Sequence, residues 1–138
     1  MISRTTDRAN EETVMEGTVD NKALVNLATG LEDAERVTVA FLVATAALSQ
    51  GKQVVIWATK EAVRLGLPGE AQGVACKGCP PLEQLFEQFA DGGGELWLCP
   101  ICVESRDLGD AEKVPNAKIA GATPMWQWAG SNTTVFSY

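Results

Sequence analysis

The chain has 138 residues, enough for one domain with its own hydrophobic core, and 46% of them are apolar while 21% are charged. Its formal net charge of −7, from 18 acidic and 11 basic residues, argues against nucleic acid and anionic membrane surfaces as partners. Because the sequence contains no histidine, any catalysis must use thiols, carboxylates, lysines or backbone dipoles.

The first twenty residues are polar and charged, and we expect a flexible tail ahead of a single domain over residues 21–138. An alternative for residues 14–19 is an edge strand. The first ten residues lack the apolar segment of a secretory signal, and the longest apolar stretch, residues 37–48, is too short to span a bilayer. We therefore expect a cytoplasmic protein, whose cysteines would be reduced, metal-bound or transiently oxidised.

The domain begins with a predicted buried strand over residues 23–28, which ends at Thr29-Gly30. Acidic side chains then occupy the first turn of a predicted helix that runs to about Gln50. The middle of this helix, residues 37–48, carries no charge on any face. That pattern predicts either a deeply buried helix or a subunit interface, because so small a domain has little interior.

A continuous apolar run over residues 52–59 predicts a second, parallel strand, and residues 60–67 predict a short helix. A glycine-rich loop over residues 69–79 follows, with a short strand expected at Val74-Ala75. Pro80-Pro81 opens the clearest predicted helix, whose apolar residues recur with helical spacing until the glycines at 92–94.

The remaining strands are predicted over residues 95–102 and 117–122, with a helical turn or two in the polar stretch 104–114. Trp126 and Trp128 are placed near a turn, as packing or interface residues. Residues 133–138 predict a last strand or an arm that reaches a neighbouring molecule.

This alternation predicts a three-layer α/β/α domain with a mostly parallel sheet of about five strands. Ligands bind such sheets at the carboxyl ends of the strands, so that edge is the expected site. The candidate cleft residues that it gathers are Thr29, Gly30, Thr59, Lys60, Cys76, Cys79, Cys99, Cys102 and Thr123.

The four cysteines occur as two C-x2-C pairs, Cys76 with Cys79 and Cys99 with Cys102. One interpretation is a four-cysteine zinc site, which the spacing allows. A second is a thiol-disulfide or persulfide site, because backbone N–H groups at a strand end favour the thiolate and a paired thiol can resolve it. A third is that all four are small packing residues. If one pair alone matters, we favour Cys99 and Cys102, because a strand end holds a nucleophile more rigidly than a loop does.

Three segments together resemble the DsrE/DsrF-like family: residues 29–65, residues 80–102 and residues 117–128. The shared signals are a strand, a glycine turn, a long apolar helix, the G-K-x-V-V-I sequence at residue 51, and a cysteine at the end of the fourth strand. The position matching that cysteine is Cys99, with Cys102 as the second cysteine of the motif.

The resemblance implies a flavodoxin-like fold that assembles as trimers or hexamers. It also implies a sulfurtransferase-type persulfide carrier that exchanges sulfur with donor and acceptor proteins. We expect no cofactor, because Thr29-Gly30 lacks the glycine spacing of a dinucleotide-binding or phosphate-binding loop. On this hypothesis Cys99 accepts the sulfur and Cys102 assists or resolves. The rival hypotheses are an oligomeric binding or scaffold module without catalysis, and the zinc domain.

Overall fold

The computed structural model describes residues 21–138, in which strands and helices alternate. The tail predicted over residues 1–20, and the edge strand within it, lie outside the described residues. The strands are β1 (Lys22–Leu27), β2 (Gln53–Ala58), β3 (Glu95–Leu98), β4 (Ala117–Ile119) and β5 (Thr133–Ser137). The α-helices are α1 (Ala34–Ser49), α2 (Leu82–Asp91), α3 (Pro100–Glu104) and α4 (Ala122–Ala129), and the 3-10 helices are η1 (Leu31–Asp33) and η2 (Lys60–Gly66).

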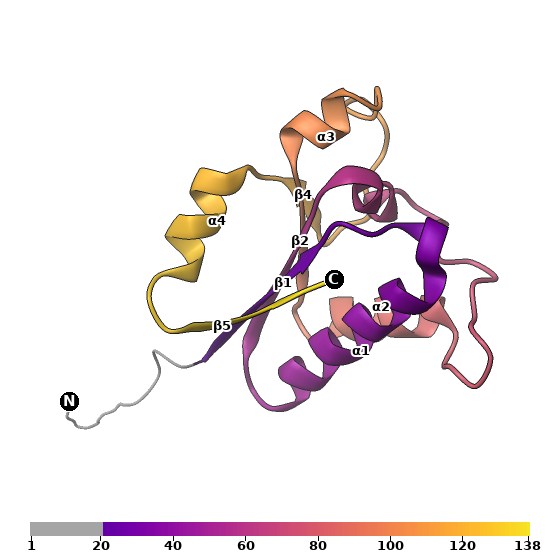
Figure 1. Cartoon of the computed structure of the whole chain (residues 1–138), viewed down its shortest axis with the longest axis horizontal. Coiled ribbons are helices and arrows are strands. Elements are labelled where there is room, and N and C mark those ends of the chain that lie inside the picture. The colour runs from indigo at the N-terminus through magenta and orange to yellow at the C-terminus, as the bar shows by residue number, and fades with distance from the viewer. Residues whose placement is uncertain (1–20) are drawn as a thin grey trace.

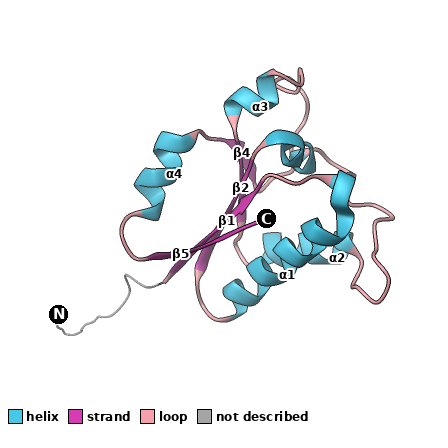
Figure 2. Ribbon diagram, in the orientation of Figure 1, coloured by secondary structure: helices cyan, strands magenta, loops and turns pink. Residues whose placement is uncertain are grey.

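The five strands form one parallel sheet in the order β4-β3-β2-β1-β5 (Figures 1 and 2). Helices α1 and α2 pack together on one face of this sheet, and α4 covers the other face. The short helices η2 and α3 follow β2 and β3 directly, so both begin at the carboxyl edge of the sheet. The predicted three-layer, flavodoxin-like α/β architecture is therefore confirmed.

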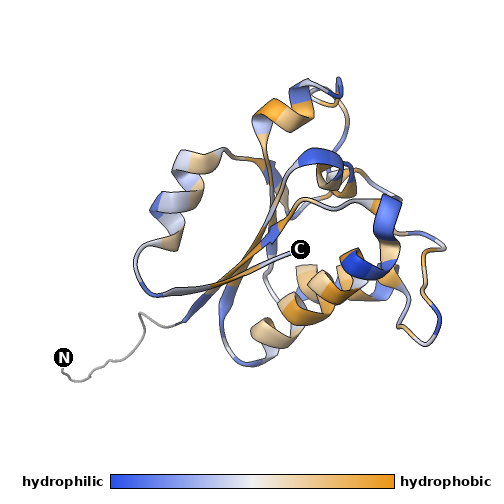
Figure 3. Cartoon of the chain, viewed as in Figure 1, coloured by the Kyte–Doolittle hydropathy of each residue, from blue (hydrophilic) through white to orange (hydrophobic). Residues whose placement is uncertain are grey.

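The core is divided between the two faces of the sheet because successive residues of a strand point to opposite sides. In β1, Val25 and Leu27 face α1 and α2 within the larger cluster, whereas Leu24 joins the smaller cluster that Met125 of α4 completes. Figure 3 shows apolar residues along the central strands and over much of α1, and a more polar α4 on the other side of the sheet.

Helix α1 buries one side only. Val37, Ala40 and Phe41 are buried against the sheet and α2, while Val39 and Leu42 on the opposite side are 39% and 38% exposed. The uncharged middle of this helix is therefore buried on the side facing the sheet and exposes apolar side chains on the opposite side.

Several predicted elements were wrong in extent or type. Val74-Ala75 is not a strand but part of an irregular loop, and the strand predicted over 95–102 ends at Leu98. Pro100 explains the second difference, since proline cannot donate to the ladder and fits the first helical position. Trp126 lies in helix α4 rather than beside a turn, and the strand predicted over 117–122 ends at Ile119.

Candidate functional site

The second cysteine pair lies where β3 passes into α3. Cys99 extends the sheet by one hydrogen bond, from its own N–H to the Ala58 carbonyl at 3.0 Å, and then caps the helix. Its carbonyl accepts the N–H of Val103 at 3.0 Å, so the first turn of α3 is closed. This turn places Cys102 in the helix, not in the strand, with its side chain above the end of β2.

The sulfur of Cys102 has a backbone donor. The N–H of Lys60 donates to Cys102 Sγ at 3.0 Å, across 42 residues of sequence. Lys60 is the first residue of η2 and has a positive φ of 55°, a conformation that non-glycine residues adopt rarely. Cys99 and Cys102 are both free thiols of intermediate exposure and pack partly against the larger core cluster. The polar backbone contact expected for a strand-end thiol therefore falls on Cys102.

An ion-pair network joins η2 to α3 beside this sulfur. Glu61 accepts from Arg64 Nε at 2.8 Å and from Arg106 Nε at 2.6 Å. Arg106 also donates to the carbonyl of Cys102 at 3.2 Å. The hydrogen bonds from Arg106 and Arg64 lower the pKa of the Glu61 carboxyl below its ordinary value of 4.5. Arg106 thus connects the helix that carries Cys102 to the residue that follows Lys60.

A close backbone approach brings the turn after β1 to the same place. A Cβ atom on Gly30 would lie 2.8 Å from the Glu61 carbonyl oxygen, so only glycine fits there without a shift. Gly30 also donates its N–H to Glu32 Oε1 at 2.9 Å. Three of the predicted residues, Gly30, Lys60 and Cys102, are therefore assembled at one edge of the sheet.

Two further predicted cleft residues follow strand ends at the same edge. Thr29 and Thr59 are partly exposed at the ends of β1 and β2, and the Thr59 N–H bonds the Leu27 carbonyl at 2.9 Å. Thr123 is exposed in the first turn of α4, the helix that covers the opposite face of the sheet from α1.

Cys76 and Cys79 are bonded to each other as a disulfide in the loop between η2 and α2. Figure 1 shows this loop at the right of the molecule, apart from α3 at the top. Within residues 21–138, no three side chains of the metal-binding types lie together as ligands. The described part of the chain therefore does not assemble the four thiols that the zinc alternative requires.

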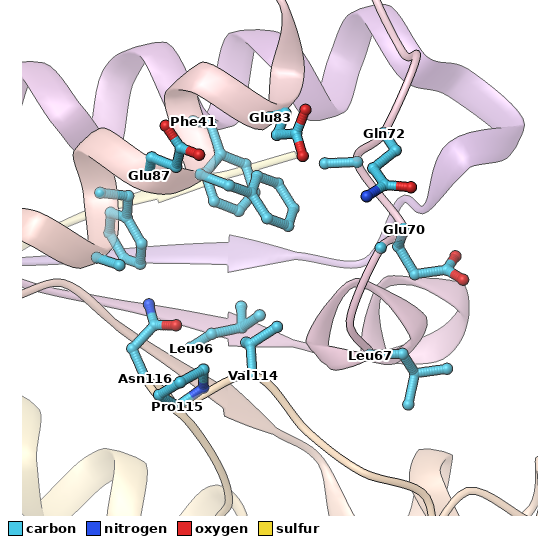
Figure 4. Close-up of a pocket in the computed structure, with 15 residues that line it drawn as sticks. Phe41, Leu67, Glu70, Gln72, Glu83, Glu87, Leu96, Val114, Pro115 and Asn116 are labelled. Carbon is cyan, nitrogen blue, oxygen red and sulfur yellow. The ribbon is translucent and has the colours of Figure 1, made fainter.

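An apolar pocket lies elsewhere in the molecule (Figure 4). It has a volume of about 220 Å³ and lies between α2, the loop after η2 and the segment before β4. Phe41, Phe86 and Leu96 form its apolar wall, and Glu83 and Glu87 of α2 lie along its rim. Its lining includes no cysteine, so the pocket and the free thiols are separate features.

Neither Arg106 nor Glu61 is among the cleft residues predicted from the sequence. The spacing of Glu61 and Arg64, three residues apart in a predicted helix, was an available signal for one of the two ion pairs. The pair with Arg106 joins residues 45 apart, and no local pattern indicates it.

A parallel, doubly wound α/β domain with a free cysteine pair at the carboxyl edge is the class that fold and site define together. The chain belongs to the DsrE/DsrF-like family, whose model matches residues 22–138. The predicted family membership is confirmed, and it associates the chain with proteins of sulfur relay.

Individual proteins agree with this assignment. The ychN protein of E. coli has a similar structure, with a TM-score of 0.69, 19% sequence identity, and coverage of 85% of this chain and 99% of that one. The chain is also 26% identical over 104 residues to the uncharacterized protein MJ0760 of Methanocaldococcus jannaschii. That match covers 75% of this chain but 38% of the relative, so the chain spans about two fifths of that protein's length. Within residues 21–138, every helix is too short or too polar to cross a bilayer.

Proposed function

We propose that the protein carries sulfane sulfur as a persulfide, with Cys102 as the accepting thiol and Cys99 as the assisting thiol. The observation that carries this proposal is the N–H of Lys60 at 3.0 Å from Cys102 Sγ. This contact places a backbone donor beside a partly exposed sulfur at the carboxyl edge of the sheet, where it can hold the sulfur in position for attack. The roles are thus exchanged relative to the sequence-based hypothesis, in which Cys99 accepted the sulfur.

The transfer step balances with a persulfide donor of the class R–S–SH. The Cys102 thiolate attacks the outer sulfur of the donor, forming a new S–S bond while the donor's S–S bond breaks. The donor leaves as the thiolate R–S⁻ and takes a proton from solvent. An acceptor thiolate then removes the outer sulfur in the same way, or the Cys99 thiolate attacks Cys102 Sγ and releases hydrosulfide. The second route leaves a Cys99–Cys102 disulfide, which a dithiol must reduce.

The site contributes position and charge to this step. The Lys60 N–H stays aimed at the sulfur because η2 is tied to α3 through Glu61 and Arg106. Partial exposure of Cys102 leaves the sulfur open to a donor, while its contact with the core limits its movement. No cofactor is part of this proposal.

Intact-mass measurement after incubation with glutathione persulfide tests the assignment. We expect wild type and C99S to gain the mass of one sulfur atom and C102S to gain none. The C76S/C79S variant is the control, because it removes the two cysteines that lie outside the proposed site and is expected to load normally. Loading that survives in C102S and is lost in C99S would assign acceptance to Cys99, and loading that is independent of both would end the proposal.

We also propose that copies of the chain assemble into a cytoplasmic homo-oligomer, a trimer or hexamer, through the outer face of α1. Val39 and Leu42 support this, since they lie together on the uncharged stretch 37–48 of the helix at 39% and 38% exposure. Light scattering with size exclusion should report an assembly for wild type and a smaller species for L42E. The control is the exposed Gln88→Glu change on α2, which should leave the size unchanged; an unchanged size for L42E would remove α1 from the interface.

A further inference from the structure

We propose that Cys76 and Cys79 form a second thiol site, which exchanges its disulfide reversibly with dithiols. The pair is joined in the loop between η2 and α2, away from the free thiols beside β3. This inference does not rest on the proposed sulfur transfer, which uses other cysteines.

The turn that holds the two sulfurs is made by the backbone. The N–H of Cys79 donates to the carbonyl of Cys76 at 3.0 Å, and Gly78 takes a positive φ of 79°, which glycine adopts without strain. The two Cα atoms are 5.1 Å apart. Because this turn does not need the sulfur atoms, the thiols remain within bonding reach after reduction. Reoxidation then requires no rearrangement of the chain.

The loop is attached to the domain at other points. Ala71 and Leu82, on either side of the pair, are 5% and 0% exposed, and the Leu82 N–H donates to the Val74 carbonyl at 2.9 Å. The stabilisation that a disulfide gives grows with the length of chain that it closes, and this pair closes a very short ring. The bond is therefore not what fixes the loop, and breaking it should leave the fold intact.

An incoming thiolate has access to the bond. Cys76 and Cys79 are partly exposed, and Lys77 and Gly78 between them are exposed. An accessible disulfide in a preformed turn has the features of an exchange site rather than of a structural staple.

The exchange balances with a dithiol as the reductant. One thiolate of the dithiol attacks a sulfur of the pair, the Cys76–Cys79 bond breaks, and a mixed disulfide forms while the other cysteine leaves as a thiolate. The second thiol of the reductant then attacks the mixed disulfide and releases the remaining cysteine. The protein gains two electrons and two protons, and the dithiol becomes a cyclic or intramolecular disulfide.

The test uses the full chain with C99S/C102S, so that Cys76 and Cys79 are its remaining thiols. The oxidised protein is treated with dithiothreitol in native buffer or in urea, quenched with acid, alkylated and weighed. We expect no alkyl group before reduction and two after it, with a native rate within about tenfold of the rate in urea. Removal of the reductant and addition of oxidised glutathione should restore the unlabelled mass.

The proposal is overturned if both thiols are alkylated before any reductant is added, or if reduction occurs only in urea. The C76S/C79S variant is the control for labelling, since its mass should not change on reduction. Sulfur loading of the same C76S/C79S variant reports on the proposed persulfide site alone. Failure of one site is therefore measured separately from failure of the other.

Discussion

Replacing Gly30 by alanine tests whether the turn after β1 positions the thiol site. The new Cβ would meet the carbonyl oxygen, carbonyl carbon and Cβ of Glu61 at 2.8, 2.9 and 2.9 Å. Two of these three atoms are backbone, so the start of η2 must move. Overpacking of this kind costs about 1–3 kcal/mol of unfolding free energy. For a chain of this size, that corresponds to a melting temperature roughly 3–10 °C lower.

The shift should also affect the chemistry, because Glu61 directly follows the residue whose N–H contacts Cys102. Urea denaturation and the rate of sulfur loading from glutathione persulfide measure the two effects on the same protein. Gly109→Ala is the matched control, since a Cβ at Gly109 meets nothing within 4 Å and Gly109 has an ordinary φ. If Gly30→Ala is as stable as Gly109→Ala, the close approach is wrong. If it is destabilised but loads sulfur at the wild-type rate, η2 does not position the thiol.

Three comparisons probe the core, the hydrogen bond of Trp57 and the ion pairs of Glu61. Phe89→Ala removes a ring that is 1% exposed and should lower the unfolding free energy, measured by urea denaturation, by about 3–5 kcal/mol. Phe136→Ala, at 48% exposure, should lower it by about 1 kcal/mol. Equal losses of unfolding free energy in the two variants would contradict the assigned core. Trp57→Phe removes the donor to the Ala120 carbonyl at 3.0 Å and should cost about 1–2 kcal/mol, and an unchanged midpoint would refute that bond. Since the arginines lower the pKa of Glu61 in the folded state, its stabilisation is present above its ordinary value of 4.5 and is lost as the pH falls through the lower folded pKa. Glu61→Gln should therefore flatten the loss of stability on acidification, and a curve identical to wild type would show that the network adds nothing.

The architecture was predictable because each central element carries a local signal. Apolar runs of strand length end in glycine or threonine, and helices of the right period follow them, as residues 82–91 illustrate. Helix α4 was missed because its eight residues contain Pro124 and two tryptophans and have no acidic residue in the first turn. Proline is tolerated so early in a helix, but it reads as a turn signal in sequence.

The candidate site was predictable only as a set of strand ends. The carboxyl-edge rule predicted that Gly30, Lys60 and Cys102 share one edge, and in the structure the Lys60 N–H lies 3.0 Å from Cys102 Sγ while Gly30 packs against the backbone of Glu61. Sequence gave no way to see that Lys60 contributes its backbone N–H, because that depends on its positive φ and on the helix beginning at Pro100. Arg106 reaches the site through its ion pair with Glu61, 45 residues away in sequence, and such a contact depends on how η2 and α3 pack together.

The order of the strands has a consequence for biosynthesis. Strand β5 is the last along the chain, yet it pairs with β1, and the Tyr138 N–H bonds the Asn26 carbonyl at 2.8 Å. During synthesis β1 can pair with β2 early. Its other edge stays unpaired until β5 has been made, more than a hundred residues after the end of β1. During that interval β1 offers an open ladder of amides and carbonyls that a second nascent chain could occupy. Slow translation of the last segment should therefore favour aggregation, and chaperone dependence should rise with the time that β1 remains uncovered.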